Sequence, residues 1–338
     1  TFWASEHAVV ATPVKKVSTT WLGELLRAMN LNQYSVSAAQ PGLSVEAISN
    51  LGIPVPPLAE QTEIAGFVEG ETARIDALIA EQETLLALLA EKRQATISHA
   101  VTRGLDPDVP MKDSGIAWLG EVPAHWRVDR FKASVAFAKN GIWGAEPCGD
   151  ESDIPCVRVA DFDRRALAVR GEIPTIRNVV ESERVGRVLQ RGDLLLEKSG
   201  GGENQPVGQV VLYDHEEPAV CSNFVARVRL REGMDSRFWR YLHAAAYSVR
   251  INTRAVKQTS GIQNLDQDQY FSEHAVFPPH SEQCAISDFL DQTADEFDLI
   301  DAEVTRAISL LKERRIALIS AAVTGQIDVR GLASEEAA

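Results

Sequence analysis

Polar side chains gather around three consecutive glycines between Gly192 and Gly208, in the sequence GDLLLEKSGGGENQPVG. A run of three leucines, typical of a buried strand, leads into the glycines, which allow positive φ angles and close approach of a partner. Amide side chains can pair with adenine, while Lys and Ser favour phosphates or guanine edges. A plain hairpin loop facing water would explain the same pattern. The candidate contact residues are Lys198, Ser199, Gly200, Gly201, Gly202, Asn204 and Gln205.

A second polar group surrounds a glycine between Arg254 and Asn264, in the sequence RAVKQTSGIQN. It offers the same types of side chain as the first segment, and taken alone it also fits a simple polar turn. The candidate contact residues are Lys257, Gln258, Thr259, Ser260 and Asn264.

Enzyme chemistry is not indicated by any motif. The glycines at 200–202 are not followed by the Lys-Ser/Thr pair of a phosphate-binding loop. No Gly-x-Ser-x-Gly, HExxH or paired His/Cys spacing predicts a nucleophile or a metal site. Asp193 and Glu197-Lys198 have the wrong spacing for a nuclease carboxylate set, so we interpret them as strand-end residues. We therefore expect a non-catalytic chain without a bound metal.

The element that must position these segments is duplicated. Residues 56–106 recur as residues 278–328, and the copies align without a gap at roughly 20 identities over about 51 positions. The alignment matches Asp76 with Asp298 and Arg93 with Arg315. A repeat of this quality indicates that the protein uses the element as a pair.

Each copy predicts a long helix, because apolar residues recur with a period near 3.5 over several heptads. About 42 residues would form a rod of roughly 60 Å. Two unrelated surface helices would not explain the matched phase, so we expect the helices to pack on each other within the chain. The predicted stripe comprises Ile64, Val68, Ile75, Leu78, Leu85 and Leu89 in the first copy, and Ile286, Leu290, Phe297, Ile300, Val304 and Leu311 in the second.

Charge is distributed unevenly along the chain. The net charge of −14 seems unsuited to nucleic acid, but residues 113–277 hold 21 Lys+Arg against 23 Asp+Glu, whereas the rest holds 13 against 25. A neutral domain can present a basic face, so DNA binding stays open. No apolar run approaches the roughly 20 residues of a membrane span. Four scattered cysteines predict buried free thiols in a reducing cytoplasm.

Residues 113–277 predict a mixed α/β globule, with strands near 156–159, 194–196, 207–212 and 224–230 and helices near 178–189 and 236–246. Residues 1–50 and the Pro56-Pro57 pair after them follow the order of the end of this globule: a helical segment, a polar turn with glycine, then a Pro-Pro pair. This similarity predicts that the chain begins inside a domain of the same kind.

Together these pieces resemble the DNA specificity (S) subunit of a type I restriction–modification enzyme. The resemblance rests on the duplicated PPxxEQ motif with its long helix, the glycine-rich loop, the SGIQNL turn, and the segment GIAWLGEVPAHW. It covers the chain from about Gln40 to Gly331.

The resemblance implies α+β target recognition domains and two conserved helices that form an intramolecular antiparallel coiled coil. The domains would read the halves of a split duplex DNA site, with the helix pair as a ruler of about 18 base pairs. The expected segments are a remnant of a first recognition domain (1–55), the first helix (56–104), a linker leading into the next domain (105–126), the second recognition domain (127–277), the second helix (278–328) and a disordered tail (329–338).

The resemblance also implies partners. Methyltransferase (M) subunits, two in number, would bind S-adenosylmethionine and flip the target adenine, and restriction (R) subunits would use ATP and Mg²⁺. We expect no cofactor bound by this chain, no membrane contact and a cytoplasmic location.

One departure from the family is expected at the amino-terminal end. This chain starts about two-thirds of the way through a first recognition domain, and some 50 residues are too few for a complete reading head. Two alternatives therefore stay open. The chain could be a coiled-coil interaction scaffold without sequence-specific DNA binding, or truncated chains could pair to rebuild a two-headed reader.

Overall fold

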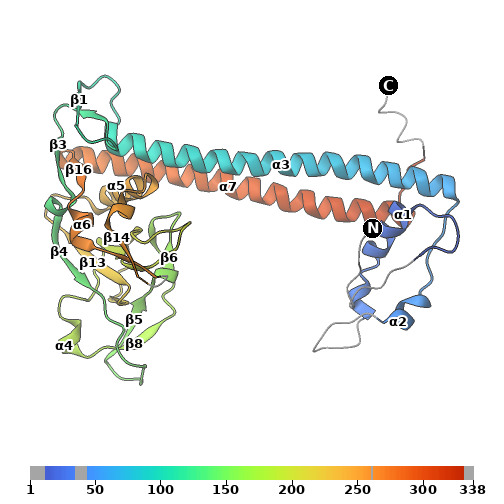
Figure 1. The fold of residues 1–338 in the computed structure, drawn as a ribbon, viewed down its shortest axis with the longest axis horizontal. Coiled ribbons are helices and arrows are strands. Elements are labelled where there is room, and N and C mark those ends of the chain that lie inside the picture. Colours follow the sequence, from blue (N-terminus) through green and yellow to red (C-terminus); the bar gives the residue numbers. More distant parts are fainter. Residues whose placement is uncertain (1–11, 35–43, 260–261, 331–338) are drawn as a thin grey trace. The chain divides into compact units, whose positions relative to one another are not determined.

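The computed structural model describes residues 12–34, 44–259 and 262–330. The chain divides into two compact units: unit 1 comprises residues 1–88 and 299–338, and unit 2 comprises residues 89–298. Two long helices, α3 (Leu58–Arg103) and α7 (His280–Val323), contribute to both units (Figure 1). Within the described ranges, no helix combines the length and the apolar character needed to cross a lipid bilayer.

In each unit the two helices lie side by side and run antiparallel (Figure 1). In unit 1, Asp76 of α3 forms an ion pair with Arg315 of α7. In unit 2, Arg93 of α3 forms an ion pair with Asp298 of α7. The predicted mixed α/β fold with two long, mutually packed helices is therefore confirmed.

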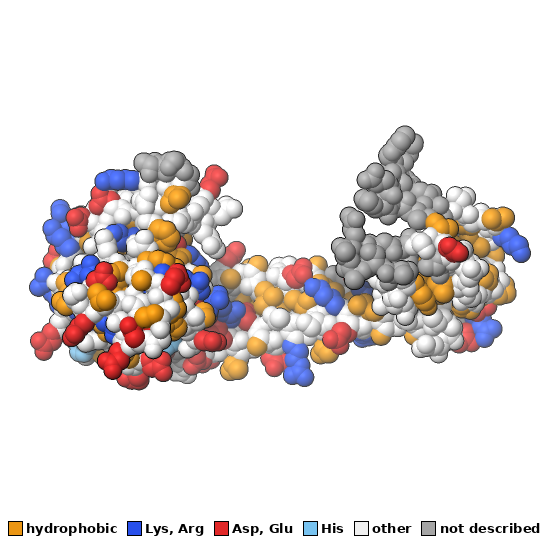
Figure 2. All heavy atoms as spheres, turned by 90° about the horizontal axis from the view of Figure 1, so that it is seen from below, with side chains coloured by type: hydrophobic (Ala, Val, Ile, Leu, Met, Phe, Trp, Pro, Cys, Tyr) orange, Lys and Arg blue, Asp and Glu red, His pale blue; other side chains and the backbone are white. Residues whose placement is uncertain are grey.

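The predicted stripe faces inward at most positions, but the seam differs from the prediction at three of them; the buried residues of the stripe are Ile64, Val68, Ile75, Ile286, Leu290, Phe297 and Val304. Leu78, Leu85 and Ile300 were expected inside, but they are 46%, 38% and 44% exposed. Ile79 and Leu86, each one residue further along, are half-buried instead. The sequence ALIAEQETLLALL contains two adjacent apolar stripes, and periodicity alone does not say which one packs. Side chains of the unused stripe leave hydrophobic surface along the helices (Figure 2).

Unit 1 is a small helical cluster around the start of α3 and the end of α7. Its elements are α1 (Thr19–Ala28), the 3₁₀ turn η1 (Leu31–Tyr34) and α2 (Val45–Ser49). Trp21 and Leu25 of α1 are buried because they lie one helical turn apart and face the long helices. They pack with Ile64, Ala65, Val68, Ile319, Ala322, Val323 and Val329.

Unit 2 is a globule of short strands and helices packed on the end of α3 and the start of α7. Its strands are β1 (Met111–Asp113), β2 (Glu121–Pro123), β3 (Arg127–Arg130), β4 (Val135–Asn140), β5 (Asp153–Val157), β6 (Phe162–Asp163), β7 (Ala168–Val169), β8 (Ile176–Asn178), β9 (Asp193–Glu197), β10 (Ser199–Gly200), β11 (Val210–Tyr213), β12 (Val220–Cys221), β13 (Val225–Leu230), β14 (Val256–Thr259), β15 (Ile262–Leu265) and β16 (His274–Phe277). Its helices are α4 (Glu181–Arg184), α5 (Ser236–Ser248) and α6 (Gln267–Phe271), with 3₁₀ turns η2 (Phe131–Ala133), η3 (Val159–Asp161) and η4 (Ile251–Ala255).

The largest sheet has the strand order β4-β13-β9-β11-β7-β6. β9 lies near its middle and is buried along its whole length, which explains the apolar run of its three central residues, Leu194, Leu195 and Leu196. Smaller sheets have the orders β12-β5-β8, β10-β15-β14, β16-β3 and β1-β2. The main core joins the apolar residues of β9, β11 and β13 to α5 and to the long helices.

The repeated glutamine of the PPxxEQ motif docks a helix in both units. In unit 1, Oε1 of Gln61 accepts a hydrogen bond from the backbone N–H of Ser18, which caps α1, at 2.9 Å. In unit 2, Oε1 of Gln283 accepts one from the backbone N–H of Asp235, which caps α5, at 3.0 Å. α1 and α5 are therefore equivalent elements, as the similar order of the two segments predicted.

Three local expectations were wrong or incomplete. The helix expected at 178–189 is only the short α4, because residues 176–178 are held as β8 against β5. The linker at 105–126 contains the β1-β2 hairpin and ends at a fully buried Trp126. Cys148 is exposed and Cys284 half-buried, so only Cys156 and Cys221 are buried thiols. Of the disordered tail expected at 329–338, Val329 is buried, and residues 331–338 lie outside the described residues, as does the turn around Pro41.

Candidate nucleic-acid interface

The two polar segments singled out from the sequence meet in one sheet. β10 belongs to the glycine-rich segment, whereas β14 and β15 belong to the second segment, and the three pair antiparallel in the order β10-β15-β14. Ser199 lies opposite Asn264, and Gly200 lies opposite Gln263. This long-range pairing turns two separate loops into one continuous polar surface.

Side-chain hydrogen bonds fix this surface. The hydroxyl of Ser199 donates to Oδ1 of Asn264 at 2.6 Å, which fixes the orientation of the Asn264 amide. Oε1 of Gln263 accepts from the backbone N–H of Val207 at 3.2 Å. Ser199 and Asn264 are both half-buried, and a held amide in that position is suited to reading a base edge.

The glycine loop needs its glycines for steric reasons. Gly200 and Gly201 have φ angles of +116° and +60°. A Cβ on Gly201 would lie 2.7 Å from the backbone nitrogen of Val207 and 2.9 Å from the carbonyl oxygen of Gln205. Gly202 has no atom within 4 Å of its Cβ position. Asn204 and Gln205 follow in the loop and are exposed.

Lys198 stands at the edge of this surface without a carboxylate partner among the described residues. Its Nζ donates to Oδ1 of Asn140 at 2.6 Å. Burial lowers the pKa of its ammonium group, although Asp268 and Asp266 act in the opposite direction. A partly desolvated cation bonded only to a neutral amide favours an anionic ligand such as phosphate.

Further cations lie around Asn140. Nε of Arg187 donates to the Asn140 carbonyl at 3.2 Å, and Nζ of Lys139 donates to the Val185 carbonyl at 2.5 Å. Both groups therefore bond to neutral backbone oxygens. Sequence reasoning missed this part of the surface, because Lys139, Arg187 and Lys198 belong to three separate segments.

Lys257, unlike Lys198, has a carboxylate partner among the described residues. Its Nζ forms an ion pair with Oδ2 of Asp266 at 2.6 Å, and this hydrogen bond is the main reason why the pKa of Asp266 is lowered. Gln258 and Thr259 belong to β14, where they face Gln263 and Ile262 in the ladder. Ser260 lies outside the described residues.

An exposed aromatic ring lies beside the glycine segment. The carbonyl of Phe224 accepts from the backbone N–H of Lys198 at 2.7 Å, and the Phe224 side chain is 52% exposed. The adjoining β15 leaves Ile262 56% exposed. An apolar side chain next to polar donors is a common feature of base-contacting surfaces. Phe224 was read from the sequence only as part of a strand.

Comparisons with known proteins find similar chains. Residues 1–86 match the family model described as "Type I restriction modification DNA specificity domain". The EcoprrI specificity subunit of Escherichia coli is 41% identical over 68 residues, which is 20% of this chain and 17% of that protein. The EcoKI specificity subunit of Escherichia coli K12 is 22% identical over 326 residues, covering 94% of this chain and 68% of that protein.

One solved chain shares the fold. It belongs to a structure that concerns complex assembly and conformational transition of the type I R-M system, and it aligns with a TM-score of 0.67 at 18% identity. The alignment covers 92% of this chain and 72% of that chain. The chain is therefore similar in sequence and in fold to specificity subunits of type I restriction–modification systems. The family model stops before the globule of unit 2, so the surface described above is assigned from its geometry alone.

Two buried carboxylates of unit 2 are held by arginines. Asp193 accepts from Nε of Arg227 at 2.7 Å and from Nε of Arg229 at 2.5 Å. Glu197 binds Arg164, with Oε2 3.1 Å from Nη2. Their side chains are 0% and 1% exposed, so they stabilise the sheet beneath the surface.

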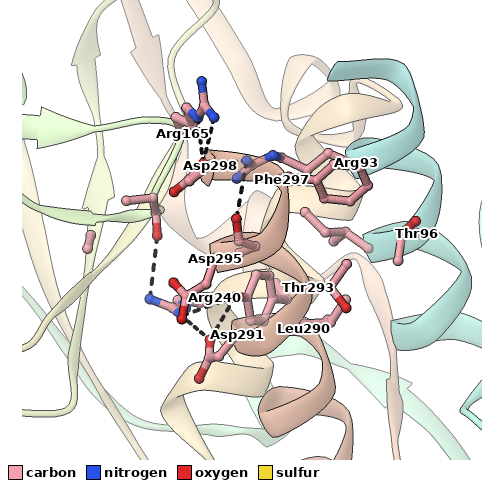
Figure 3. Close-up of a pocket in the computed structure, with 15 residues that line it drawn as sticks. Arg93, Thr96, Arg165, Arg240, Leu290, Asp291, Thr293, Asp295, Phe297 and Asp298 are labelled. Atoms are coloured by element: carbon pink, nitrogen blue, oxygen red, sulfur yellow. Dashed lines mark hydrogen bonds and ion pairs between the residues drawn. The ribbon is translucent and has the colours of Figure 1, made fainter. Parts of the chain in front are cut away.

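A cavity of about 240 Å³ lies where the globule meets the helix pair within unit 2 (Figure 3). Arg165 and Arg93 both reach Asp298, while Arg240 and the hydroxyl of Tyr241 reach Asp291. Burial would raise the pKa of the Asp298 carboxyl, but hydrogen bonds and charge from both arginines hold it below its ordinary value. Arg93, Arg165 and Arg240 thus bind carboxylates that also line the cavity. The ion pairs that involve Arg165 and Arg240 hold the globule against α7.

One group of side chains has metal-ligand types. Ligand atoms of Cys148, Asp150 and Asp153 lie within 4.8 Å of one another. Nδ2 of Asn178 donates to all three, at 3.2, 2.8 and 2.9 Å respectively. The amide thus holds the cluster together as a hydrogen-bonded turn.

Proposed function

We propose that this chain reads part of a bipartite duplex DNA site as the specificity subunit of a type I restriction–modification enzyme. The observation that supports this proposal is the convergence of two distant polar segments in the β10-β15-β14 sheet, beside Lys198. Lys198 and its neighbouring cations would bind phosphates and set the orientation. Asn264, held by Ser199, would donate to a base edge in the major groove.

The long helices would serve assembly. Their exposed apolar side chains offer surface to methyltransferase subunits, two in number, that bind S-adenosylmethionine. Restriction subunits with ATP and Mg²⁺ would join through that complex. The chain itself would bind no cofactor and perform no chemistry. The exposed apolar residues on the helices are Leu78, Leu85, Leu88, Phe289, Leu299, Ile300, Leu310 and Ile316.

Selection from randomised duplexes tests this function. The chain is mixed with its methyltransferase partner and a pool of random duplexes, and the retained DNA is sequenced after gel-shift separation. We expect enrichment of a defined half-site. Retention of duplexes without any sequence preference would instead identify a scaffold that has lost specific DNA binding.

The number of copies of this chain in the complex is tested separately. Two copies of this chain could pair to present two reading heads to a bipartite site, and light scattering of the free chain measures this directly. A dimer, together with a selected site that has two-fold symmetry, would support pairing. A strictly monomeric chain that selects a single half-site would exclude it.

A further inference from the structure

Phe224 lies at the tip of a short turn between β12 and β13. Its side chain is 52% exposed, whereas Ser222 and Val225 on either side of the tip are buried. The backbone N–H of Ser222 donates to the Val157 carbonyl at 2.9 Å, and the backbone N–H of Val225 donates to the Ser222 carbonyl at 2.9 Å. The turn is therefore held at both ends, and it presents the phenylalanine ring outward.

The other exposed aromatic rings of the globule are covered by arginines. Within the described part of residues 113–277, Phe137 and Trp143 are the other exposed rings. The guanidinium carbon of Arg227 lies 5.1 Å from the centroid of the Phe137 ring, and that of Arg177 lies 4.6 Å from the centroid of the Trp143 ring. Among the described residues, no guanidinium group or aromatic ring covers Phe224 in this way.

Lys198 is the direct neighbour of Phe224. Val225 pairs with Glu197 where β13 meets β9, and the next pair along brings Phe224 opposite Lys198. The Phe224 carbonyl accepts from the backbone N–H of Lys198 at 2.7 Å and from that of Ser199 at 3.3 Å. Residues that lie opposite each other on antiparallel strands direct their side chains to the same face. The exposed ring and the lysine proposed above to contact a phosphate therefore share one face.

The major groove of duplex DNA offers one apolar group that such a ring can recognise. The base edges there carry hydrogen-bond donors and acceptors, and thymine adds its C5 methyl group. This methyl group lies on the side of the base edge that faces the backbone of its own strand, so a side chain next to a phosphate-binding lysine can reach it. A phenylalanine side chain has no hydrogen-bonding group, so contact with the methyl group is its means of identifying thymine.

We propose that Phe224 contacts the C5 methyl group of a thymine in the half-site, and so specifies an A·T pair next to the phosphate bound by Lys198. This inference rests on the proposed function, because it requires that this surface faces the major groove. It adds a specificity-determining residue whose recognition does not depend on hydrogen bonds. The half-site therefore contains a thymine whose methyl group itself contributes to affinity.

Uracil in place of thymine tests the contact from the DNA side. The duplex selected by the chain with its methyltransferase partner is synthesised with deoxyuridine at each thymine in turn, which removes one methyl group and keeps every hydrogen-bonding group. We expect one position at which this change weakens binding about fourfold, the effect of one buried methyl group. In the Phe224→Ala chain the same position should show a change of less than about 1.5-fold.

Phe137→Ala is the matched control on the protein side. It removes another exposed phenylalanine of the globule, one on β4 whose ring is covered by Arg227. This variant should keep the full discrimination between thymine and uracil. Measuring both duplexes with the wild type and with each variant separates the contact from any change in folding or in affinity for the methyltransferase, since such changes affect both duplexes equally.

The outcomes separate this inference from the proposed function. A selected site with no thymine that is sensitive to loss of its methyl group would overturn the inference alone, as would a sensitivity that persists in Phe224→Ala. An equal loss of affinity of that variant for both duplexes would identify an apolar wedge between base pairs or a contact to the protein partner, and would reject the methyl contact. Failure to select any site would overturn the proposed function and this inference with it.

Discussion

The guanidinium group of Arg315 donates to the carboxylate of Asp76, with Nε 2.9 Å from Oδ1. The repeat equivalents of these two residues, Arg93 and Asp298, form the same ion pair in unit 2. A single pair of repeat positions thus joins α3 to α7 twice, since antiparallel packing brings each arginine against the aspartate of the other copy. The duplication is the physical origin of the helix pair.

The two ion pairs should differ in their contribution to stability. Asp298 also binds Arg165 of the globule, with Nη2 2.6 Å from Oδ1, whereas among the described residues Asp76 pairs only with Arg315 of α7. We expect Asp76→Asn to lower the free energy of unfolding by less than about 0.5 kcal/mol, as for most exposed pairs. Asp298→Asn should cost about 1 kcal/mol because two partners are lost. Urea denaturation of the two variants measures both values.

The acid dependence of the Asp298 pair follows from the lowered pKa of its carboxyl group. A carboxyl whose folded pKa lies below the unfolded value stabilises the protein above the unfolded pKa, and this contribution is lost as the pH falls through the folded value. The difference in the free energy of unfolding between the wild-type protein and the Asp298→Asn variant should therefore become smaller at acidic pH. An equal cost at neutral and acidic pH would contradict this account.

The two lysines of the proposed DNA surface should differ in effect. Within the described ranges the ammonium group of Lys198 bonds only to the neutral Asn140 amide, whereas Lys257 is already paired with Asp266. We expect Lys198→Ala to weaken duplex binding by the methyltransferase complex and to lower the salt slope by about 0.9, the value for one phosphate contact. Lys257→Ala, the matched control, should change the slope less. Equal slopes in the wild type and the Lys198→Ala variant would remove Lys198 from the phosphate contacts.

Sequence periodicity predicted those elements whose pattern of apolar and polar residues lies within one segment or occurs twice in the chain. The long helices, the buried leucine strand β9 and the helix α5 each follow from a pattern within a short window. The glycine-rich segment was also recognised as special, because its residue types are unusual for a strand end. These features need no knowledge of distant contacts.

The remaining features depend on packing between segments far apart in the chain. Leu78 and Ile79 are both apolar, so packing against the facing helix decides which of the two lies in the seam. The pairing of Ser199 with Asn264 joins segments 65 positions apart. Phe224 lies beside Lys198 because backbone pairing brings the two segments together, and no sequence motif indicates this contact. No single-segment pattern encodes such contacts.

The glycine loop gives a steric prediction with its own control. Gly201→Ala would place a Cβ 2.7 Å from the backbone nitrogen of Val207, at a φ of +60°. We expect loss of affinity for the selected duplex by at least about tenfold, since the backbone must move and a non-glycine residue there is strained. Gly171→Ala, with open space at its Cβ and a position outside the proposed DNA surface, should bind DNA like the wild type. Similar affinities for both variants would show that the loop does not contact DNA.

Acid should destabilise unit 2 through His243. Burial lowers the pKa of this imidazole to about 3; Nδ1 lies 2.8 Å from the Tyr270 hydroxyl, and the ring stacks on Phe131. In the unfolded chain the pKa is about 6.5, so only the unfolded state takes up the proton between these values. Stability is complete above the unfolded pKa and falls by about 1.4 kcal/mol per pH unit below it.

His243→Gln should flatten this dependence in denaturation experiments between about pH 5 and about pH 7. Tyr270→Phe should lower stability but keep the slope, because it leaves the buried imidazole in place. An unchanged slope in His243→Gln would assign the acid sensitivity to other groups.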